Sequence, residues 1–335
     1  MTTAVDTQED IEQYRREIGG YCYRMLGSVF EADDATQETM LKAWRSIDRF
    51  EGRSSLRTWL YRIATNVCLD MLRSRPRREQ PMDMGPSSPA DERLLGPMLT
   101  EHPWLLPMPD GRSDPDAGHR DDPAAAVIGR ESIRLAFVAA LQHLPPRQRA
   151  VLILREVLAW PAEEVATLLD TSAASVNSAL QRARATMASR DLESLPSLAL
   201  PSEHEDLLTS FVEAFERYDM TRIAELLRDD VMQNMPPFAM WLRGAADIIA
   251  WMQGPGHDCE GSRLVATWAN GCAAFGQYRR AETFGDPRGG HLPWGLQVIE
   301  ISDADGSGAK ISQITNFLHP ELFPAFGLPA YLEAS

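Results

Sequence analysis

The first quarter of the chain spaces its apolar residues three and four positions apart, as amphipathic helices do. Residues 8–27 and 31–46 follow this pattern, and a third helix follows a short polar loop that starts at Phe50. Its predicted apolar face comprises Leu56, Leu60, Ile63, Val67 and Met71. The pattern therefore predicts an all-α domain over residues 8–77.

Residues 78–130 show almost no periodicity and contain many Pro, Gly, Ser and Asp residues. A structureless linker of this length is unusual within a compact domain. Apolar residues interrupt it at 94–99 and at 104–109. Because a tryptophan is unexpected in a solvated linker, we predict that Trp104 and Leu105 dock between domains.

Residues 131–190 again have helical spacing and predict four helices, of which the third starts at Pro161, a favourable first helical residue. A turn at 170–172 separates it from the fourth helix, and Ser172 can cap that helix. Two helices joined by a three-residue turn form a helix-turn-helix, whose second helix enters the major groove of DNA. The segment therefore predicts a second all-α domain that binds DNA.

The pattern changes after a Pro-containing connector at residues 190–202. Three predicted helices come first, at residues 203–217, 221–228 and 245–253, and strand-like runs then occupy residues 263–270, 272–282, 293–302 and 310–318. Helices followed by an antiparallel meander predict an α+β cone over residues 203–335. Phe323 and Phe326 lie in an apolar tail, and we predict that they also dock between domains.

Charge separates these segments. The whole chain of 335 residues has a formal net charge of −15, and residues 203–335 hold 9 basic and 19 acidic residues. Between Arg57 and Arg78, however, six arginines stand against the single acid Asp70. A solvated helix face is the usual explanation of a charge run, but a cationic face on an acidic protein indicates an anionic partner, most often nucleic acid.

Composition limits the remaining chemistry. The four cysteines form no CxxC pair, and the seven histidines show no metal-ligand spacing near them. We expect a reduced, cytoplasmic protein without a metal or another cofactor. The N-terminus is polar, so we expect no signal peptide, and no apolar run reaches the roughly 18–20 residues of a membrane span.

The stretches EADDATQETMLKAW and FEGRSSLRTWLYRIATNVCLDMLR resemble the second conserved region of bacterial sigma factors of the extracytoplasmic-function (ECF) group. The resemblance implies that Asp34, Gln37 and Glu38 bind the β′ clamp of RNA polymerase. It also implies that the loop from Phe50 to Leu56 forms a pocket for a base flipped out of the −10 promoter element. The implied −10 contacts are Arg53, Ser54, Ser55, Arg57, Arg62 and Asn66.

The chemistry of these residues agrees with that role. Taking a base out of the stack costs a few kcal/mol, a polar loop can hydrogen-bond its edge, and arginines can hold the phosphates. Trp59 and Tyr61 could offer aromatic faces, although packing in the core is the favoured interpretation for both.

The helix-turn-helix resembles the fourth sigma region, which implies that it binds the −35 element through Ser172, Ser175, Asn177, Ser178, Arg182 and Arg184. The family often has basic residues where this chain has Asn177 and Ala179. Weaker phosphate clamping should reduce the salt dependence of binding by about one counterion per missing contact.

Residues 203–335 resemble the SnoaL-like branch of the NTF2-like fold, which implies a fused regulatory domain. Some members of that fold are enzymes, but no catalytic pair can be assigned here. The candidates by type are Asp230, Asp247 and Asp258, interpreted as turn or cap residues, and His257, His291 and His319, interpreted as structural.

The sequence therefore predicts a multidomain alternative sigma factor without catalytic activity. Its expected partners are core RNA polymerase, through the β and β′ subunits, and promoter DNA. We expect the cone to inhibit the other domains of its own chain. Whether the cone also binds a small molecule is a question that the sequence leaves open. One alternative is a cyclase- or isomerase-like enzyme fused to a DNA-binding segment. Another is a one-component repressor, which would not need the pattern formed by Asp34, Gln37 and Glu38.

Overall fold

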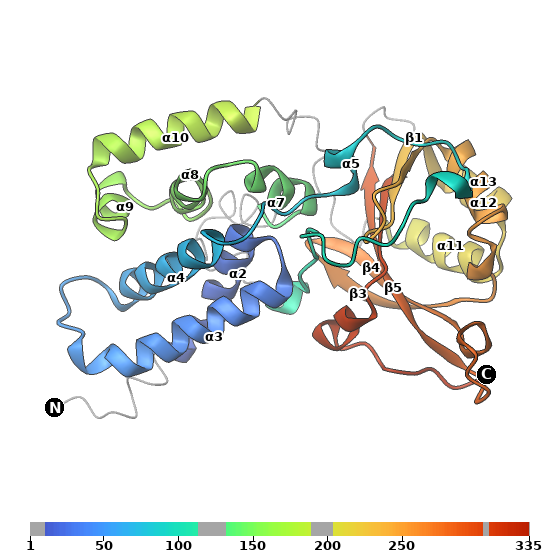
Figure 1. The fold of residues 1–335 in the computed structure, drawn as a ribbon, viewed down its shortest axis with the longest axis horizontal. Coiled ribbons are helices and arrows are strands. Elements are labelled where there is room, and N and C mark those ends of the chain that lie inside the picture. The colour runs from blue at the N-terminus through green and yellow to red at the C-terminus, as the bar shows by residue number, and fades with distance from the viewer. Residues whose placement is uncertain (1–10, 113–131, 189–203, 304–307, 335) are drawn as a thin grey trace. The chain divides into compact units, whose positions relative to one another are not determined.

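The structure, a computed structural model, describes residues 11–112, 132–188, 204–303 and 308–334. The chain divides into two compact units (Figure 1). Unit 1 comprises residues 1–78 and 105–195, and unit 2 comprises residues 79–104 and 196–335. The predicted connector at 190–202 and the end of the predicted linker, residues 113–130, lie outside the described residues. Within the described residues, no helix has the length and apolar character needed to cross a bilayer.

Three helices form the first part of unit 1. Gly27, in the left-handed conformation with φ of 70°, ends the first of them, and Ser28 is already extended. Ser55 caps the third, because its side chain accepts a hydrogen bond from the Thr58 backbone N–H at 3.0 Å. The helices are α2 (Arg15–Leu26), α3 (Val29–Ser46) and α4 (Leu56–Leu72).

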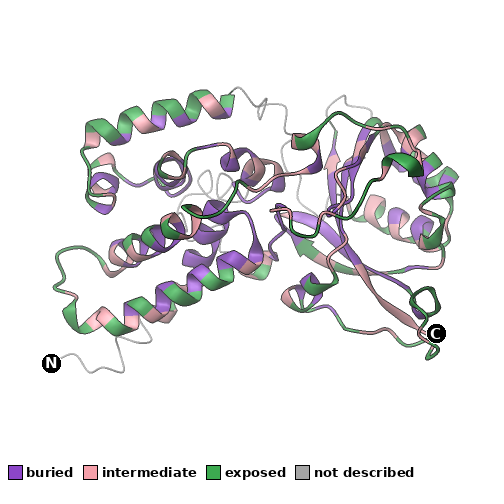
Figure 2. Ribbon diagram, in the orientation of Figure 1, coloured by how far each residue is buried: buried purple, intermediate pink, exposed green. Residues whose placement is uncertain are grey.

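The buried face of α4 differs from the predicted one. Leu60 and Val67 are buried as expected, whereas Leu56, Ile63 and Met71 are only partly buried. The other buried residues of α4 are Thr58, Tyr61, Ala64, Thr65 and Cys68. Figure 2 colours the ribbon by burial, with buried residues in purple. The face is rotated because α4 contacts both α2 and α3 and also helices of the second half of unit 1.

The second half of unit 1 contains the four predicted helices. Its last two are joined by a tight turn in which Asp170 adopts a positive φ of 53°, so the helix-turn-helix is present. The elements are α7 (Leu135–Gln142), α8 (Pro146–Leu152), a π-helical extension (Ile153–Val157), α9 (Ala162–Leu168) and α10 (Ala173–Ala188).

Buried arginines join the two halves of unit 1. The Arg149 guanidinium on α8 donates to the backbone carbonyl of Met25 on α2 and to the side chain of Gln142. Arg24 on α2 donates to the Ser132 hydroxyl at 2.9 Å. Burial lowers the pKa of each guanidinium to about 10, so both remain charged at neutral pH.

Unit 2 is an α+β domain. Its six-stranded sheet has the order β2-β1-β6-β5-β4-β3, and α11, α12 and α13 contribute to a shared hydrophobic core with it. The helices are α11 (Glu205–Glu216), α12 (Met220–Leu226) and α13 (Ala245–Gln253). The strands are β1 (Leu227–Asn234), β2 (Trp241–Arg243), β3 (Arg263–Ala269), β4 (Cys272–Arg280), β5 (His291–Ser302) and β6 (Lys310–Phe317).

The sheet corrects one part of the sequence analysis. The four predicted strands are present, but β1 and β2 were missed, and β1 pairs parallel to β6. The sheet is therefore mixed and not a purely antiparallel meander. The pattern misled because α12 passes directly into β1 at Leu227, so the helical spacing expected for residues 221–228 extends into a strand.

The C-terminal tail packs on the side of the sheet opposite the helices. Phe275 belongs to the core under the helices, so Gly276 and Tyr278 point to the other face. There the ring of Phe323, in a 3₁₀ helix (Pro320–Phe326), meets Tyr278 edge-on with centroids 5.1 Å apart. Phe323 and Phe326 are buried, and their predicted role between domains stays a prediction.

The predicted linker is divided between the two units. Residues 79–104 lie on unit 2, where Leu99 N–H donates to the Pro237 carbonyl at 2.9 Å. In unit 1, Leu106 N–H donates to the Gly27 carbonyl at 3.0 Å. Trp104 and Leu105, at the division, are each 2% exposed. Their docking between domains likewise stays a prediction.

Two adjacent glycines test how the tail is held. Gly289 and Gly290 both have positive φ, but only at Gly290 would an added Cβ meet tail atoms, 2.4 Å from the Leu332 carbonyl oxygen. We expect Gly290→Ala to lower the thermal stability of unit 2 by about 1–3 kcal/mol more than Gly289→Ala, because overpacking adds to the shared conformational cost. Thermal unfolding followed by circular dichroism measures the difference. Equal losses would show that the tail does not pack against Gly290.

Candidate nucleic-acid interface

A groove of about 410 Å³ opens where the polar loop meets α4. Phe50 and Trp59 contribute aromatic rings whose centroids are 5.2 Å apart. The polar part of the lining includes Arg53, Ser54 and Arg62. Aromatic faces next to hydroxyl and guanidinium groups can stack an unpaired base and hold its phosphate.

The loop residues predicted to bind DNA are open to solvent. Arg53, Ser54 and Ser55 are exposed, and Arg53 pairs with Glu51 at 2.7 Å. Ser55 has a structural role as the cap of α4, so its hydroxyl is already engaged. Asn66 is exposed one turn beyond Arg62 on the same face of α4.

The sequence suggested that Arg57 lies on a free cationic face. In the structure, its guanidinium pairs with the buried Glu17. Its Nε donates to Glu17 Oε1 at 2.5 Å, and its guanidinium lies 5.2 Å from the ring centroid of Trp160. Tyr61 is fully buried and donates to the same Glu17 oxygen, so core packing is the correct interpretation for Tyr61. Burial is the main reason why the pKa of Tyr61 is raised well above its usual value. The role of Arg57 in DNA binding stays a prediction.

Helix α9 already occupies part of the α4 surface. The Thr58 hydroxyl donates to Glu164 Oε1 at 2.5 Å, and Arg62 Nη2 donates to the Thr167 carbonyl at 2.6 Å. Thr167 lies in the last turn of α9, where the helix dipole favours a cation. Thr167 and Leu168 also line the groove. The second half of unit 1 therefore binds Arg62, one of the α4 residues predicted to contact DNA.

The outward face of α10 is open. All six residues predicted for −35 binding are exposed: Ser172, Ser175, Asn177, Ser178, Arg182 and Arg184. Ser172 caps the helix by accepting from Ser175 N–H at 3.2 Å, which confirms the capping expected from the sequence. Arg184 pairs with Glu156 at 2.6 Å.

Asp34, Gln37 and Glu38 are exposed together on α3. Their spacing of three and four residues places them on one helix face. The neighbouring Asp33 forms an ion pair with Arg112, and Arg16 donates to the Gly111 carbonyl at 2.6 Å. The predicted polymerase-binding face therefore lies next to the place where the linker is attached to unit 1.

The histidine and aspartate candidates of unit 2 mostly have local partners. His319 bonds Glu321 at 2.7 Å and His257 lies 3.3 Å from Glu260. His291 bonds the Gly261 carbonyl at 3.0 Å. Asp230 pairs with Arg228, whose hydrogen bond lowers the pKa of that carboxyl. Within the described residues, no group of three His, Cys, Asp or Glu side chains could hold a metal ion.

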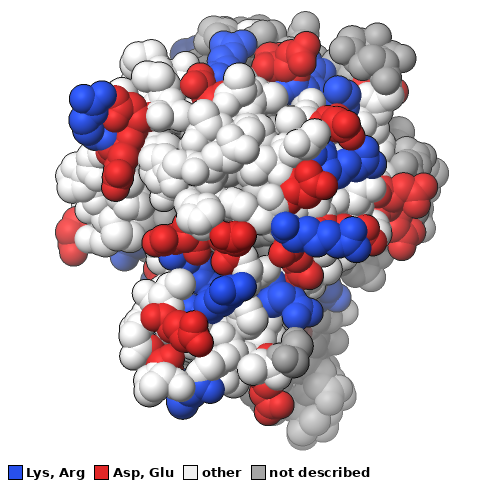
Figure 3. All heavy atoms as spheres, turned by 90° about the vertical axis from the view of Figure 1, so that its right-hand side faces the viewer, with Lys and Arg blue, Asp and Glu red and all other residues white. Residues whose placement is uncertain are grey.

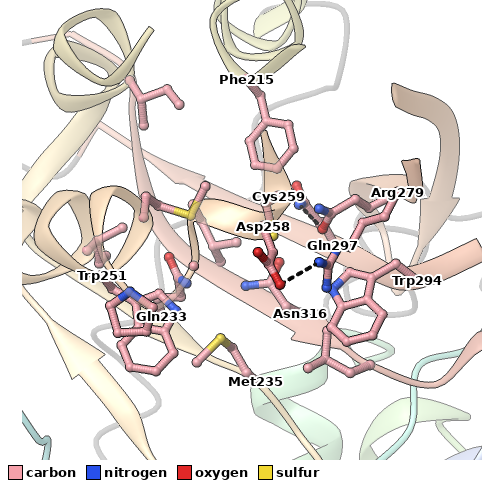
Figure 4. A pocket seen from close by; sticks show the side chains of 18 of the residues that line it. Phe215, Gln233, Met235, Trp251, Asp258, Cys259, Arg279, Trp294, Gln297 and Asn316 are labelled. Carbon is pink, nitrogen blue, oxygen red and sulfur yellow. Dashed lines mark hydrogen bonds and ion pairs between the residues drawn. The ribbon is translucent and has the colours of Figure 1, made fainter. Parts of the chain in front are cut away.

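Sequence reasoning missed a cavity of about 240 Å³ in unit 2 (Figure 4). Asp258, expected in a turn, lines it and pairs with Arg279 at 3.0 Å. The other polar lining residues are Gln233, Gln277, Gln297 and Asn316. Glutamines within otherwise apolar strands were the signal, but without the strand register the sequence does not show that they meet.

Two protein-family models match the two helical halves of unit 1. The model of sigma-70 region 2 matches residues 11–78, and the model of sigma-70 region 4 matches residues 134–187. The ECF RNA polymerase sigma factor SigG of Mycobacterium tuberculosis is 44% identical over 329 residues, which cover 97% of this chain and 84% of SigG. SigJ of the same organism is 30% identical over 251 residues, covering 73% of this chain and 72% of SigJ.

A crystal structure of M. tuberculosis SigJ shows the same fold. The two structures align over 96% of the present chain and 99% of the SigJ chain, with a TM-score of 0.59 and 22% sequence identity. The two helical halves of unit 1 thus define a DNA-binding transcription initiation factor. The chain belongs to the ECF sigma factors. It directs promoter-specific transcription initiation with RNA polymerase, as the sequence predicted.

The exposed face of α3 gives a test of polymerase binding. We expect replacing Gln37 and Glu38 together by alanine to weaken binding to core RNA polymerase about tenfold, because neither side chain is buried and both would be interface contacts. Titration of labelled protein with core polymerase measures the affinity. The matched control replaces Gln253 and Glu260, which are exposed on unit 2, by alanine. Equal affinities of the two double variants would contradict the assignment.

Proposed function

We propose that this sigma factor binds a flipped base of the −10 element in the groove at the start of α4. The groove carries the proposal, since it combines the Phe50 and Trp59 rings with Arg53 and Arg62. Stacking on an aromatic side chain contributes about 1–3 kcal/mol per base and tolerates any sequence. The loop hydroxyls and Asn66 would then supply hydrogen bonds that distinguish bases.

The −35 element binds to α10 in this proposal, through the six exposed polar residues of its outer face. Asp34, Gln37 and Glu38 bind the β′ clamp of core polymerase, and the helix-turn-helix contacts the β subunit. The protein acts by binding alone and has no catalytic step. The ion pair of Asp258 with Arg279 supports this, because it engages the carboxylate that lines the cavity of unit 2.

The packing of α9 on α4 supports a closed resting state of unit 1. The Thr58 hydroxyl donates a hydrogen bond to Glu164, and Arg62 Nη2 donates one to the Thr167 carbonyl. A donor that is bound to α9 in this way is not available to a DNA strand. Promoter binding therefore requires the two halves of unit 1 to separate. Polymerase would favour the open form by binding it more tightly.

Unit 2 modulates this equilibrium through the linker segment that it holds. A brake based on charge alone is poorly supported, since basic side chains lie among the acidic ones on the face of the molecule shown in Figure 3. The tail is part of the fold of unit 2, with Leu322 fully buried and Phe323 1% exposed. A chain that ends at His319 would lose these core residues, so point substitutions test the modulation better than truncation.

The two promoter contacts can be separated experimentally. We expect Asn66→Ala or Ser55→Ala to impair strand opening at the −10 element, and Arg182→Ala to impair −35 recognition and lower the salt slope by about one. Permanganate footprinting with core polymerase on linear and premelted templates distinguishes the defects. Premelting should rescue Asn66→Ala and not Arg182→Ala, and the reverse outcome would invert the two roles.

The closed state gives a second test. Glu164→Ala removes the acceptor of the Thr58 hydrogen bond, so we expect it to raise the affinity for single-stranded −10 DNA about two- to tenfold. Glu163→Ala is the control, because it removes the same charge from the adjacent exposed position. Fluorescence anisotropy with a labelled oligonucleotide measures both. Equal effects of the two substitutions would show that only charge matters and that α9 does not compete with DNA.

A further inference from the structure

The cavity of unit 2 lies between chemically different walls. The apolar wall comes from the helices, with Phe211 and Phe215 on α11 and Trp251 on α13. The polar wall is one face of the sheet. Gln277 and Arg279 lie two residues apart on β4 and therefore point to this face, and Gln297 lies on β5. Asn316 of β6 is the register partner of Gln297, so the polar side chains form a row across the strands. Such a cavity suits a molecule with an apolar body and one polar edge.

Two buried polar atoms of this row have no hydrogen-bond partner among the described residues. They are the Nε of Arg279 and the Oε1 of Gln297, and the two residues are 8% and 3% exposed. The Gln297 amide is held in place, because its Nε2 donates to Gln277 Oε1 at 2.9 Å. Gln277 in turn donates to the Ser262 hydroxyl at 3.1 Å. Buried polar groups are normally paired, so one acceptor and one donor left in a single cavity point to a ligand.

Arg279 is preorganised to bind a carboxylate. Its guanidinium lies 4.5 Å from the ring centroid of Trp294, and its Nη2 pairs with Asp258 Oδ2 at 3.0 Å (Figure 4). The Asp258 side chain is 78% exposed, so this carboxylate reaches the guanidinium from the rim of the cavity. A carboxylate inside the cavity could take Nε and Nη2 together in the two-bond arrangement that arginine favours. Asp258 would then be its competitor.

We propose that unit 2 binds a small cyclic carboxylic acid that also carries a hydroxyl group. The carboxylate binds Arg279, the hydroxyl donates to Gln297 Oε1, and the ring packs against the aromatic side chains of the helices. An apolar cavity of about 150 Å³ holds benzene, so a cavity of about 240 Å³ suits roughly ten non-hydrogen atoms. A monohydroxybenzoate has this size and chemistry.

The roof of the cavity includes Leu95, which belongs to the linker segment that lies on unit 2. The segment is attached on both sides of Leu95. Ser88 N–H donates to the Trp241 carbonyl at 2.8 Å, and Leu99 N–H donates to the Pro237 carbonyl at 2.9 Å. A ligand that fills the cavity contacts Leu95 and changes how firmly residues 88–99 are held. This coupling, and its effect on transcription, rests on the proposed function of the linker, whereas ligand binding does not.

Binding is tested on the full-length protein by isothermal titration calorimetry with 2-, 3- and 4-hydroxybenzoate, benzoate and the three hydroxybenzamides. We expect at least one hydroxybenzoate to bind more tightly than benzoate and than its own amide. Arg279→Lys should weaken that binding roughly tenfold to a hundredfold, because it removes the two-bond arrangement. Asp258→Asn should tighten binding, because it removes the competing charge from an exposed position where folding is not at risk.

Gln297→Met tests the hydroxyl contact, since it should abolish the preference for the hydroxybenzoate over benzoate while benzoate binding persists. Arg263→Lys, on the exposed strand β3 position, is the control and should change nothing. Circular dichroism establishes that each variant is folded. The proposal is overturned if no acid of the panel binds, or if Arg279→Lys and Asp258→Asn leave binding unchanged. Hydrogen exchange of residues 88–99 with and without the acid tests the coupling separately, and unchanged exchange alongside tight binding would overturn the coupling alone.

Discussion

The contact between the halves of unit 1 depends on two buried guanidinium groups, each of which donates across the boundary as well as within its own half. Arg149 donates to the Met25 and Leu144 carbonyls and to Gln142, and Arg24 donates to Ser132 and to the Gly20 carbonyl. Taking a charge out of water costs several kcal/mol, and good hydrogen bonds only offset that cost. The contact is therefore specific in geometry and modest in net stability. The opening that we propose for unit 1 needs this combination, because its two halves would have to separate on the promoter.

The first turns of α4 likewise carry two sets of side chains with different roles. Near its start, Thr58 and Arg62 are donors that either α9 or a nucleic acid can satisfy. Glu17 by contrast holds Arg57 and Tyr61 at the boundary of the core, and these contacts do not depend on α9. In the proposed open state of unit 1, the first set of donors is exposed and the second set stays in place. The core contacts of α4 are then kept while its predicted binding face becomes available.

The features that the sequence predicts are those that depend on interactions between residues close together in the chain. Local signals sufficed for the helices of unit 1, the Ser172 cap and four of the six strands, because spacing and capping act within a few residues. Strand β1 was missed because its partner β6 lies about eighty residues away. The contacts of Arg57 with Glu17 and Trp160 were not predicted, because both partners are distant in sequence. The cavity needed the register of three strands, which no local pattern contains.

The linker passes from unit 2 to unit 1 between two consecutive residues. Residue 104 belongs to unit 2 and residue 105 to unit 1, and neighbouring Cα atoms are only about 3.8 Å apart. Beyond Leu105, the chain is bonded to Gly27 and, through Arg112, to Asp33 on the helix that carries Asp34, Gln37 and Glu38. In the proposed mechanism, a change in how unit 2 holds residues 79–104 reaches α3 through covalent bonds and a few hydrogen bonds. The linker can carry the proposed regulation because it has an anchor on each unit.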